Sequence, residues 1–171
     1  MNQPAQTGKH PKGLYVLFFT EMWERFGYYL MVGILFLFMT NSSGKGLPKA
    51  MGADVVGTFI ALVYLTPFIG GLLADRYLGY IKSIFIGGAL MAAGYLTIAL
   101  PGEYTAYIAM GLIIVGNGFF KPNISTLLGN MYNREDLRPL KDNAYNIFYM
   151  GINIGAFFCN FVAAILRNRI G

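Results

Sequence analysis

Long apolar runs alternate with short polar connections along the chain. A run of about 20 apolar residues is long enough to cross the ~30 Å hydrocarbon core of a bilayer as a helix. The pattern therefore predicts an all-α integral membrane protein, with five transmembrane helices behind a polar tail over residues 1–13. The predicted helices are 14–39, 54–74, 81–100, 104–128 and 142–166.

The connections between the predicted helices are polar and mostly short. Two prolines, Pro67 and Pro122, fall inside predicted helices, which they are expected to bend. The connections are a glycine-containing loop at 41–53, tight turns at 74–82 and 101–104, and a longer charged linker at 130–143.

Composition supports the membrane assignment. The chain is 56% hydrophobic and only 12% charged, whereas a soluble domain usually has about a quarter of its residues charged. The net charge of +5 does not come from a basic cluster with interleaved aromatic residues, so no nucleic-acid partner is predicted. Cys159 is the single cysteine, which excludes a disulfide within the chain.

The distribution of basic residues predicts how the helices are oriented. With the N-terminus in the cytoplasm, seven Lys and Arg residues flank the helices on that side, against four on the other. Cytoplasmic loops carry an excess of Lys and Arg, so a cytoplasmic N-terminus is favoured. The short loops favour a bacterial inner membrane. The seven are Lys9, Lys12, Arg76, Lys82, Arg134, Arg138 and Lys141, and the four are Lys45, Lys49, Arg167 and Arg169.

The first predicted helix contains charged residues where lipid would make them costly. Each charge near a bilayer centre costs at least ~2.5–3.5 kcal/mol on insertion scales. Glu21 and Arg25 are spaced i,i+4, so they can form an ion pair on one helix face. A helix that began only at Phe26 would leave about 14 apolar residues, too few to span. The polar stripe consists of Glu21, Glu24, Arg25, Tyr28 and Tyr29.

Other predicted helices carry polar groups at a similar depth. Counted from the predicted helix ends, Lys121, Tyr64 and Asn153 fall with the first-helix charges in a slab about 6 Å thick. Taken singly, Tyr64 is explained by packing and Asn153 by helix–helix hydrogen bonding. Because buried membrane charges pair or mark ion pathways, we expect Glu21 or Glu24 to pair with Lys121.

Nothing in the sequence predicts an enzyme or a metal site. The chain has no HExxH, no GxSxG and no Cys/His cluster, and its single histidine, His10, lies outside the apolar runs. We therefore expect no catalytic residues and no cofactor.

Four segments resemble motifs of the proton-coupled oligopeptide transporter family, within the major facilitator superfamily. That family has two six-helix bundles with the substrate between them. The resemblance implies that this chain is most of the N-terminal bundle and that a C-terminal bundle is missing from it. The segments are EMWERFGYY (21–29), GGLLADRYLG (70–79), GNGFFKPNIS (116–125) and FYMGINIGAF (148–157).

The resemblance also implies roles for individual residues in symport of di- and tripeptides with protons. By their positions in the motifs, proton coupling is expected to involve Glu21, Glu24, Arg25 and Lys121. Peptide binding is expected to involve Arg25, Tyr28, Tyr29, Tyr64, Lys121 and Asn153.

The chain departs from the family pattern at several positions. Leu30 and Val32 stand where the family commonly has glycine and arginine, and Ser83 replaces a Thr, Ala or Val. Val32 falls on the same helix face as the polar stripe, so the sequence leaves the exact substrate open. The alternatives are a relative that carries another small peptide-like or anionic solute, and a truncated membrane fragment that does not transport.

Overall fold

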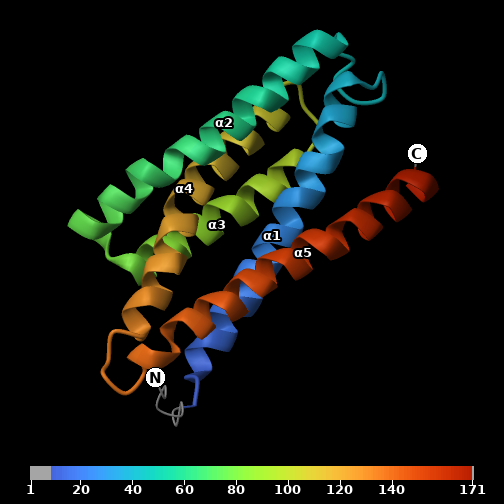
Figure 1. The fold of residues 1–171 in the computed structure, drawn as a ribbon. Helices are drawn as coiled ribbons and strands as arrows, with labels where there is room; N and C mark the ends of the chain where they lie inside the picture. The colour runs from blue at the N-terminus through green and yellow to red at the C-terminus, as the bar shows by residue number, and fades with distance from the viewer. Residues whose placement is uncertain (1–8, 171) are drawn as a thin grey trace. The chain divides into compact units, whose positions relative to one another are not determined.

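The structure is a computed structural model that describes residues 9–170, with side chains as far as residue 166. Every regular element among the described residues is helical, which confirms the all-α prediction (Figure 1). The elements are α1 (Lys12–Thr40), α2 (Lys49–Leu73), the π-helix η1 (Ala74–Leu78), α3 (Tyr80–Ile98), α4 (Thr105–Met131), the 3₁₀-helix η2 (Arg138–Leu140) and α5 (Lys141–Ile170).

Four stretches of the described chain are long and apolar enough to cross a membrane. They are Lys12–Thr40, Lys49–Leu78, Tyr80–Ile98 and Arg138–Leu166. The predicted helix 104–128 is present as α4, which has 27 residues but is not among these four. Its polar residues Asn117, Lys121 and Asn123 lower its hydropathy, so α4 differs from the other four in composition rather than in length.

Several connections are shorter than the sequence predicts. α2 begins at Lys49, directly after Pro48, whose carbonyl accepts a hydrogen bond from the N–H of Gly52 at 2.9 Å. Proline suits the start of a helix because its fixed φ is already close to the helical value. The 74–82 turn is mostly taken up by η1 and ends at Gly79, whose φ of +77° favours glycine.

The described chain divides into two compact units. One consists of Met1–Gly52 and Leu128–Gly171, and therefore contains α1 and α5. The other is Ala53–Leu127 and contains α3 with most of α2 and α4.

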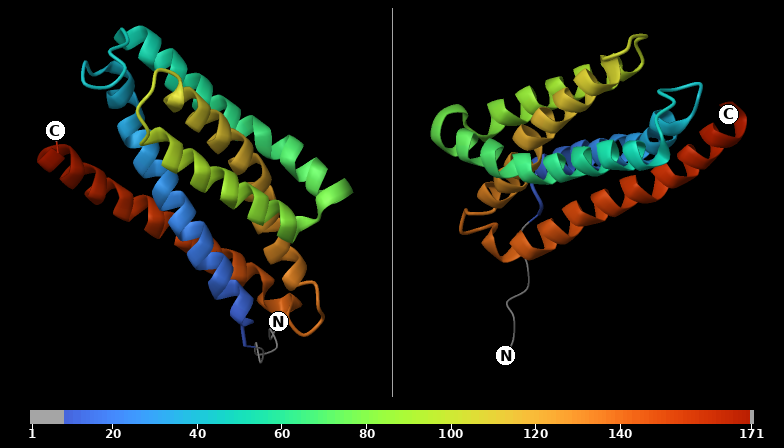
Figure 2. Two further views of the ribbon diagram at one scale, coloured as in Figure 1. Left: turned by 180° about the vertical axis from the view of Figure 1, so that it is seen from behind. Right: turned by 90° about the horizontal axis from the view of Figure 1, so that it is seen from above.

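In the first unit, α1 and α5 lie side by side and run in the same direction from their N-terminal ends (Figures 1 and 2). Two glycines on α5 allow this approach. A Cβ on Gly155 would overlap the carbonyl oxygen of Met22, and one on Gly151 would lie 2.9 Å from the ring of Phe18. Small residues at helix–helix contacts are the usual way for membrane helices to pack closely.

In the second unit, α4 packs closely against both α2 and α3. A Cβ on Gly87 of α3 would lie 2.6 Å from the carbonyl oxygen of Gly116. One on Gly94 would lie 2.6 Å from the side chain of Ile113. The glycine-rich segments of the sequence are thus placed where the backbones meet.

Candidate functional site

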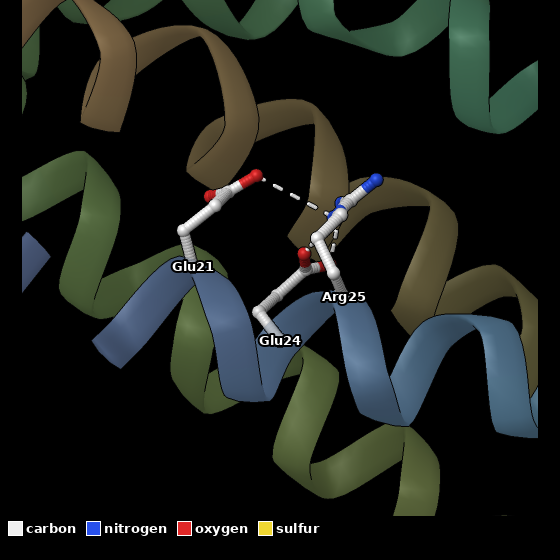
Figure 3. Close-up of polar contacts among 3 residues, drawn as sticks. All are labelled: Glu21, Glu24 and Arg25. Carbon is white, nitrogen blue, oxygen red and sulfur yellow. Dashed lines mark hydrogen bonds and ion pairs between the residues drawn. The ribbon is translucent and has the colours of Figure 1, made fainter. Parts of the chain in front are cut away.

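A buried cluster of three charged side chains lies on α1, formed by Glu21, Glu24 and Arg25 (Figure 3). The guanidinium of Arg25 donates through Nε and Nη2 to the carboxylate of Glu24, with Nη2 at 2.7 Å from Oε1. Its Nε also lies 3.5 Å from Oε1 of Glu21. The exposed fractions are 2% for Glu21, 7% for Glu24 and 3% for Arg25.

The formal charge of this cluster depends on the protonation of its two carboxylates. With both carboxylates ionised it carries a formal charge of −1, and one proton makes it neutral. The forked, planar guanidinium of Arg25 binds one carboxylate through two nitrogens and approaches a second at the same time. Arg25 can therefore pair with either of two carboxylates, that of Glu21 or that of Glu24.

The tyrosines of the stripe continue the cluster along α1. The Cζ of Arg25 lies 5.1 Å from the ring centroid of Tyr28, which is only 3% exposed. The ring of Tyr29 meets that of Tyr28 edge to face, with centroids 5.5 Å apart, and is 37% exposed. The structure thus brings five of the predicted site residues together on one helix.

A second pair of predicted site residues meets within the other unit. The ammonium Nζ of Lys121 on α4 lies 4.8 Å from the ring centroid of Tyr64 on α2, which is a cation–π geometry. Lys121 is partly buried, whereas Tyr64 is 60% exposed.

Asn153 belongs to neither cluster. It lies on α5 between Gly151 and Gly155, which both face α1. At ~100° per residue it is about 200° from Gly151, so it points away from α1, and it is exposed. The predicted ion pair between Lys121 and Glu21 or Glu24 would join residues of the two units, and it stays a prediction.

The structure also contains a polar contact that the sequence does not predict. Nδ1 of His10 lies 2.7 Å from the hydroxyl of Tyr132, and Nδ2 of Asn143 lies 3.5 Å from Nε2 of the same ring. Tyr132 is fully buried just beyond α4, and burial raises the pKa of its hydroxyl. The contact ties the segment before α1 to the start of α5, and its 122-residue separation leaves no local signal in the sequence.

Comparison with known proteins identifies the family. Residues 81–171 match the model of the POT family. The chain belongs to this family. The POT family is a family of membrane transporters and not of enzymes, which agrees with the absence of catalytic motifs in the sequence.

Two bacterial relatives are similar to most of this chain. The chain is 43% identical over 164 residues to the uncharacterized transporter YclF of Bacillus subtilis, covering 94% of this chain and 33% of that protein. It is 42% identical over 167 residues to the di-/tripeptide transporter of Lactococcus lactis, covering 94% of this chain and 32% of the relative.

Solved POT structures are similar to this chain in fold. A mutant of the peptide transporter POT in complex with alafosfalin superposes with a TM-score of 0.86 at 44% identity, covering 92% of this chain and 33% of that one. The chain therefore spans about a third of the length of the relatives it matches.

Proposed function

We propose that this chain is the N-terminal part of a symporter that carries di- and tripeptides together with protons. In this proposal residues 14–171 belong to the N-terminal transmembrane bundle, the N-terminus is cytoplasmic, and a C-terminal bundle completes the substrate site. The observation that carries it is the buried cluster on α1, where Arg25 contacts two carboxylates within an apolar helix. Membership of a transporter family and the di-/tripeptide specificity named for the Lactococcus relative support it.

Coupling follows from the charge of the cluster. A proton on Glu21 or Glu24 removes one of the two anions that hold Arg25. The guanidinium then has donor capacity for the carboxylate of a bound peptide. Conversely, a peptide carboxylate on Arg25 weakens its hold on the glutamates and favours their protonation. Because each event makes the other more favourable, proton and peptide binding are linked.

In this proposal Lys121 of the second pair is a further cation that can bind the peptide carboxylate. The ammonium of Lys121 rests over the ring of Tyr64 and can move to a peptide carboxylate, since a charge-assisted hydrogen bond is stronger than a cation–π contact. Tyr28, Tyr29, Tyr64 and Asn153 provide hydroxyl, aromatic and amide groups for the peptide backbone and side chains.

The test uses the full-length protein in vesicles, with Glu21→Gln and Glu24→Gln as variants. Each should lose uptake of a dipeptide driven by a pH gradient but keep exchange of labelled for unlabelled dipeptide, because Gln retains the shape of Glu without its titration. Glu135→Gln, in the exposed linker after α4, is the matched control and should behave as the unaltered protein. Undiminished proton-driven uptake in both α1 variants would reject the proposed proton site.

Val32 favours a second candidate, a relative that transports another small peptide-like solute. It lies one helical turn after Tyr28 and is partly buried. An apolar side chain there adds no donor for a substrate carboxylate. Competition by a panel of peptides and peptide-like solutes against dipeptide uptake decides between the two candidates.

A further inference from the structure

One backbone carbonyl in the middle of α4 lacks its usual helical donor. Pro122 lies inside this helix and has no N–H. A helical N–H bonds to the carbonyl four residues earlier, so it is the oxygen of Gly118 that loses this bond. In an apolar environment such an oxygen is costly unless another group approaches it.

That group is the backbone of Gly70 on α2. Gly70 is buried, and a Cβ built on it would overlap the carbonyl oxygen and carbon of Gly118. Only glycine lets the two backbones meet here, and its Cα–H can donate a weak hydrogen bond to a carbonyl oxygen. Pro122 leaves the Gly118 carbonyl without its helical donor, and Gly70 lets the backbone of α2 approach that carbonyl.

A second contact lies one turn earlier on α4. The hydroxyl of Thr66 donates to the carbonyl oxygen of Ile114 at 3.0 Å. A Cβ on Gly118 would lie 2.9 Å from Cβ of Thr66, so this contact is also tight. Two positions one turn apart on α2 therefore meet two positions one turn apart on α4. We call Thr66, Gly70, Ile114 and Gly118 the α2–α4 seam.

The seam borders the lysine–tyrosine pair. Tyr64 comes two residues before Thr66, and Lys121 comes three residues after Gly118. The ammonium of Lys121 belongs to α4, whereas the ring beneath it belongs to α2. Its position 4.8 Å from the Tyr64 centroid therefore depends on how the two backbones are held against each other.

We propose that Thr66 and Gly70 are positioning residues, which hold α2 against α4 so that the ammonium of Lys121 stands over Tyr64 in reach of a peptide carboxylate. The inference rests on the proposed function, because it takes Lys121 as a carboxylate anchor. A shift of α4 along or away from α2 would move the ammonium from this place without removing its charge. The seam therefore sets how strongly the protein prefers a free peptide C-terminus.

The experiment measures this preference in the full-length protein. Inhibition constants are determined for a dipeptide and for the same dipeptide with an amidated C-terminus. The readout is the constant of the amidated peptide divided by that of the free peptide, which is large when the carboxylate is recognised. A general loss of folded protein or of transport rate changes both constants alike and leaves the ratio unmoved. Lys121→Ala defines the ratio without the anchor, which should fall by about tenfold or more.

Three variants test the seam. Gly70→Ala adds a Cβ against the Gly118 carbonyl and should lower the ratio nearly as far as Lys121→Ala. Thr66→Val removes the hydroxyl at constant shape and should lower the ratio by a smaller factor. Thr66→Ser keeps the hydroxyl and should leave the ratio close to that of the unaltered protein. Gly57→Ala is the control on the same helix, because a Cβ there meets nothing within 4 Å.

The outcomes separate the inference from the proposed function. If Lys121→Ala lowers the ratio but Gly70→Ala and Thr66→Val match Gly57→Ala, the seam has no positioning role and the anchor stands. If Lys121→Ala leaves the ratio unchanged, the anchor itself is rejected, and the inference with it. Should Gly70→Ala fail to fold, the comparison of Thr66→Val with Thr66→Ser decides.

Discussion

Arg25 shows how one side chain can satisfy two buried carboxylates. The guanidinium makes a two-nitrogen contact with Glu24 and a longer contact with Glu21, and all three side chains are almost completely shielded. Burying charges is tolerated only when they are paired, and losing one partner leaves an uncompensated charge. In the proposed function, Arg25 keeps its charge and exchanges a glutamate for a substrate carboxylate, while the proton goes to a glutamate.

Val32 gives the prediction at the residue scale. In the full-length protein, Val32→Arg would place a second bidentate donor one turn beyond Tyr28, on the same face of α1. A charge-assisted hydrogen bond contributes about 1.5–3 kcal/mol, so affinity for simple dipeptides should rise about ten- to a hundredfold. The measurement is competition against dipeptide uptake.

The control for this change is Val32→Leu, which keeps the position apolar and should leave dipeptide affinity close to that of the unaltered protein. If the arginine variant folds and its dipeptide affinities stay level with those of the leucine variant, Val32 serves only in packing. The absence of arginine at this position would then not determine selectivity.

At the scale of elements, close approach between helices depends on particular glycines. On α5, Gly155 stands against the carbonyl of Met22, where a Cβ would overlap backbone and not a movable side chain. On α1, Gly33 has nothing within 4 Å of the place where a Cβ would be. Both glycines lie inside long helices, but only Gly155 is packed against another backbone.

This contrast predicts opposite effects on stability. Gly155→Ala should lower the stability of the full-length protein by about 1–3 kcal/mol, because overpacking forces α5 away from α1. Gly33→Ala should be neutral or stabilising by up to about 1 kcal/mol, since alanine is the better helix former. Thermal unfolding of the purified protein in detergent measures both. Equal unfolding temperatures for the two variants would show that the α1–α5 contact is looser than described.

The sequence predicted the helices well because apolar runs of this length leave few alternatives. The sequence could not predict that Arg25 donates two hydrogen bonds to the adjacent Glu24, because the side chains of neighbouring residues in a helix usually point in different directions. It also missed the contact of His10 with Tyr132, which depends on how the helices are brought together. Asn153 was correctly placed on a helix, but only the positions of the α5 glycines reveal that it points away from α1.

For the whole molecule, the proposed function depends on two clusters carried by separate units of the chain. One unit holds the α1 cluster of Glu21, Glu24 and Arg25, and the other holds Lys121 over Tyr64. The chain spans about a third of the relatives it matches. In such transporters the substrate site lies between repeats that rock against each other. Function is therefore a property of the complete transporter, and the central claim has to be tested there.

The most direct test measures proton movement during peptide uptake. Full-length protein is placed in liposomes that contain a pH-sensitive dye, with an inward dipeptide gradient, no initial pH gradient and the membrane potential clamped. We expect the lumen to acidify as dipeptide enters, because each peptide brings a proton with it. The Glu21→Gln, Glu24→Gln double variant should exchange dipeptide without acidification. Acidification per transported peptide that is unchanged in the double variant, or absent in the unaltered protein, would contradict the proposal that the α1 cluster couples protons to peptides.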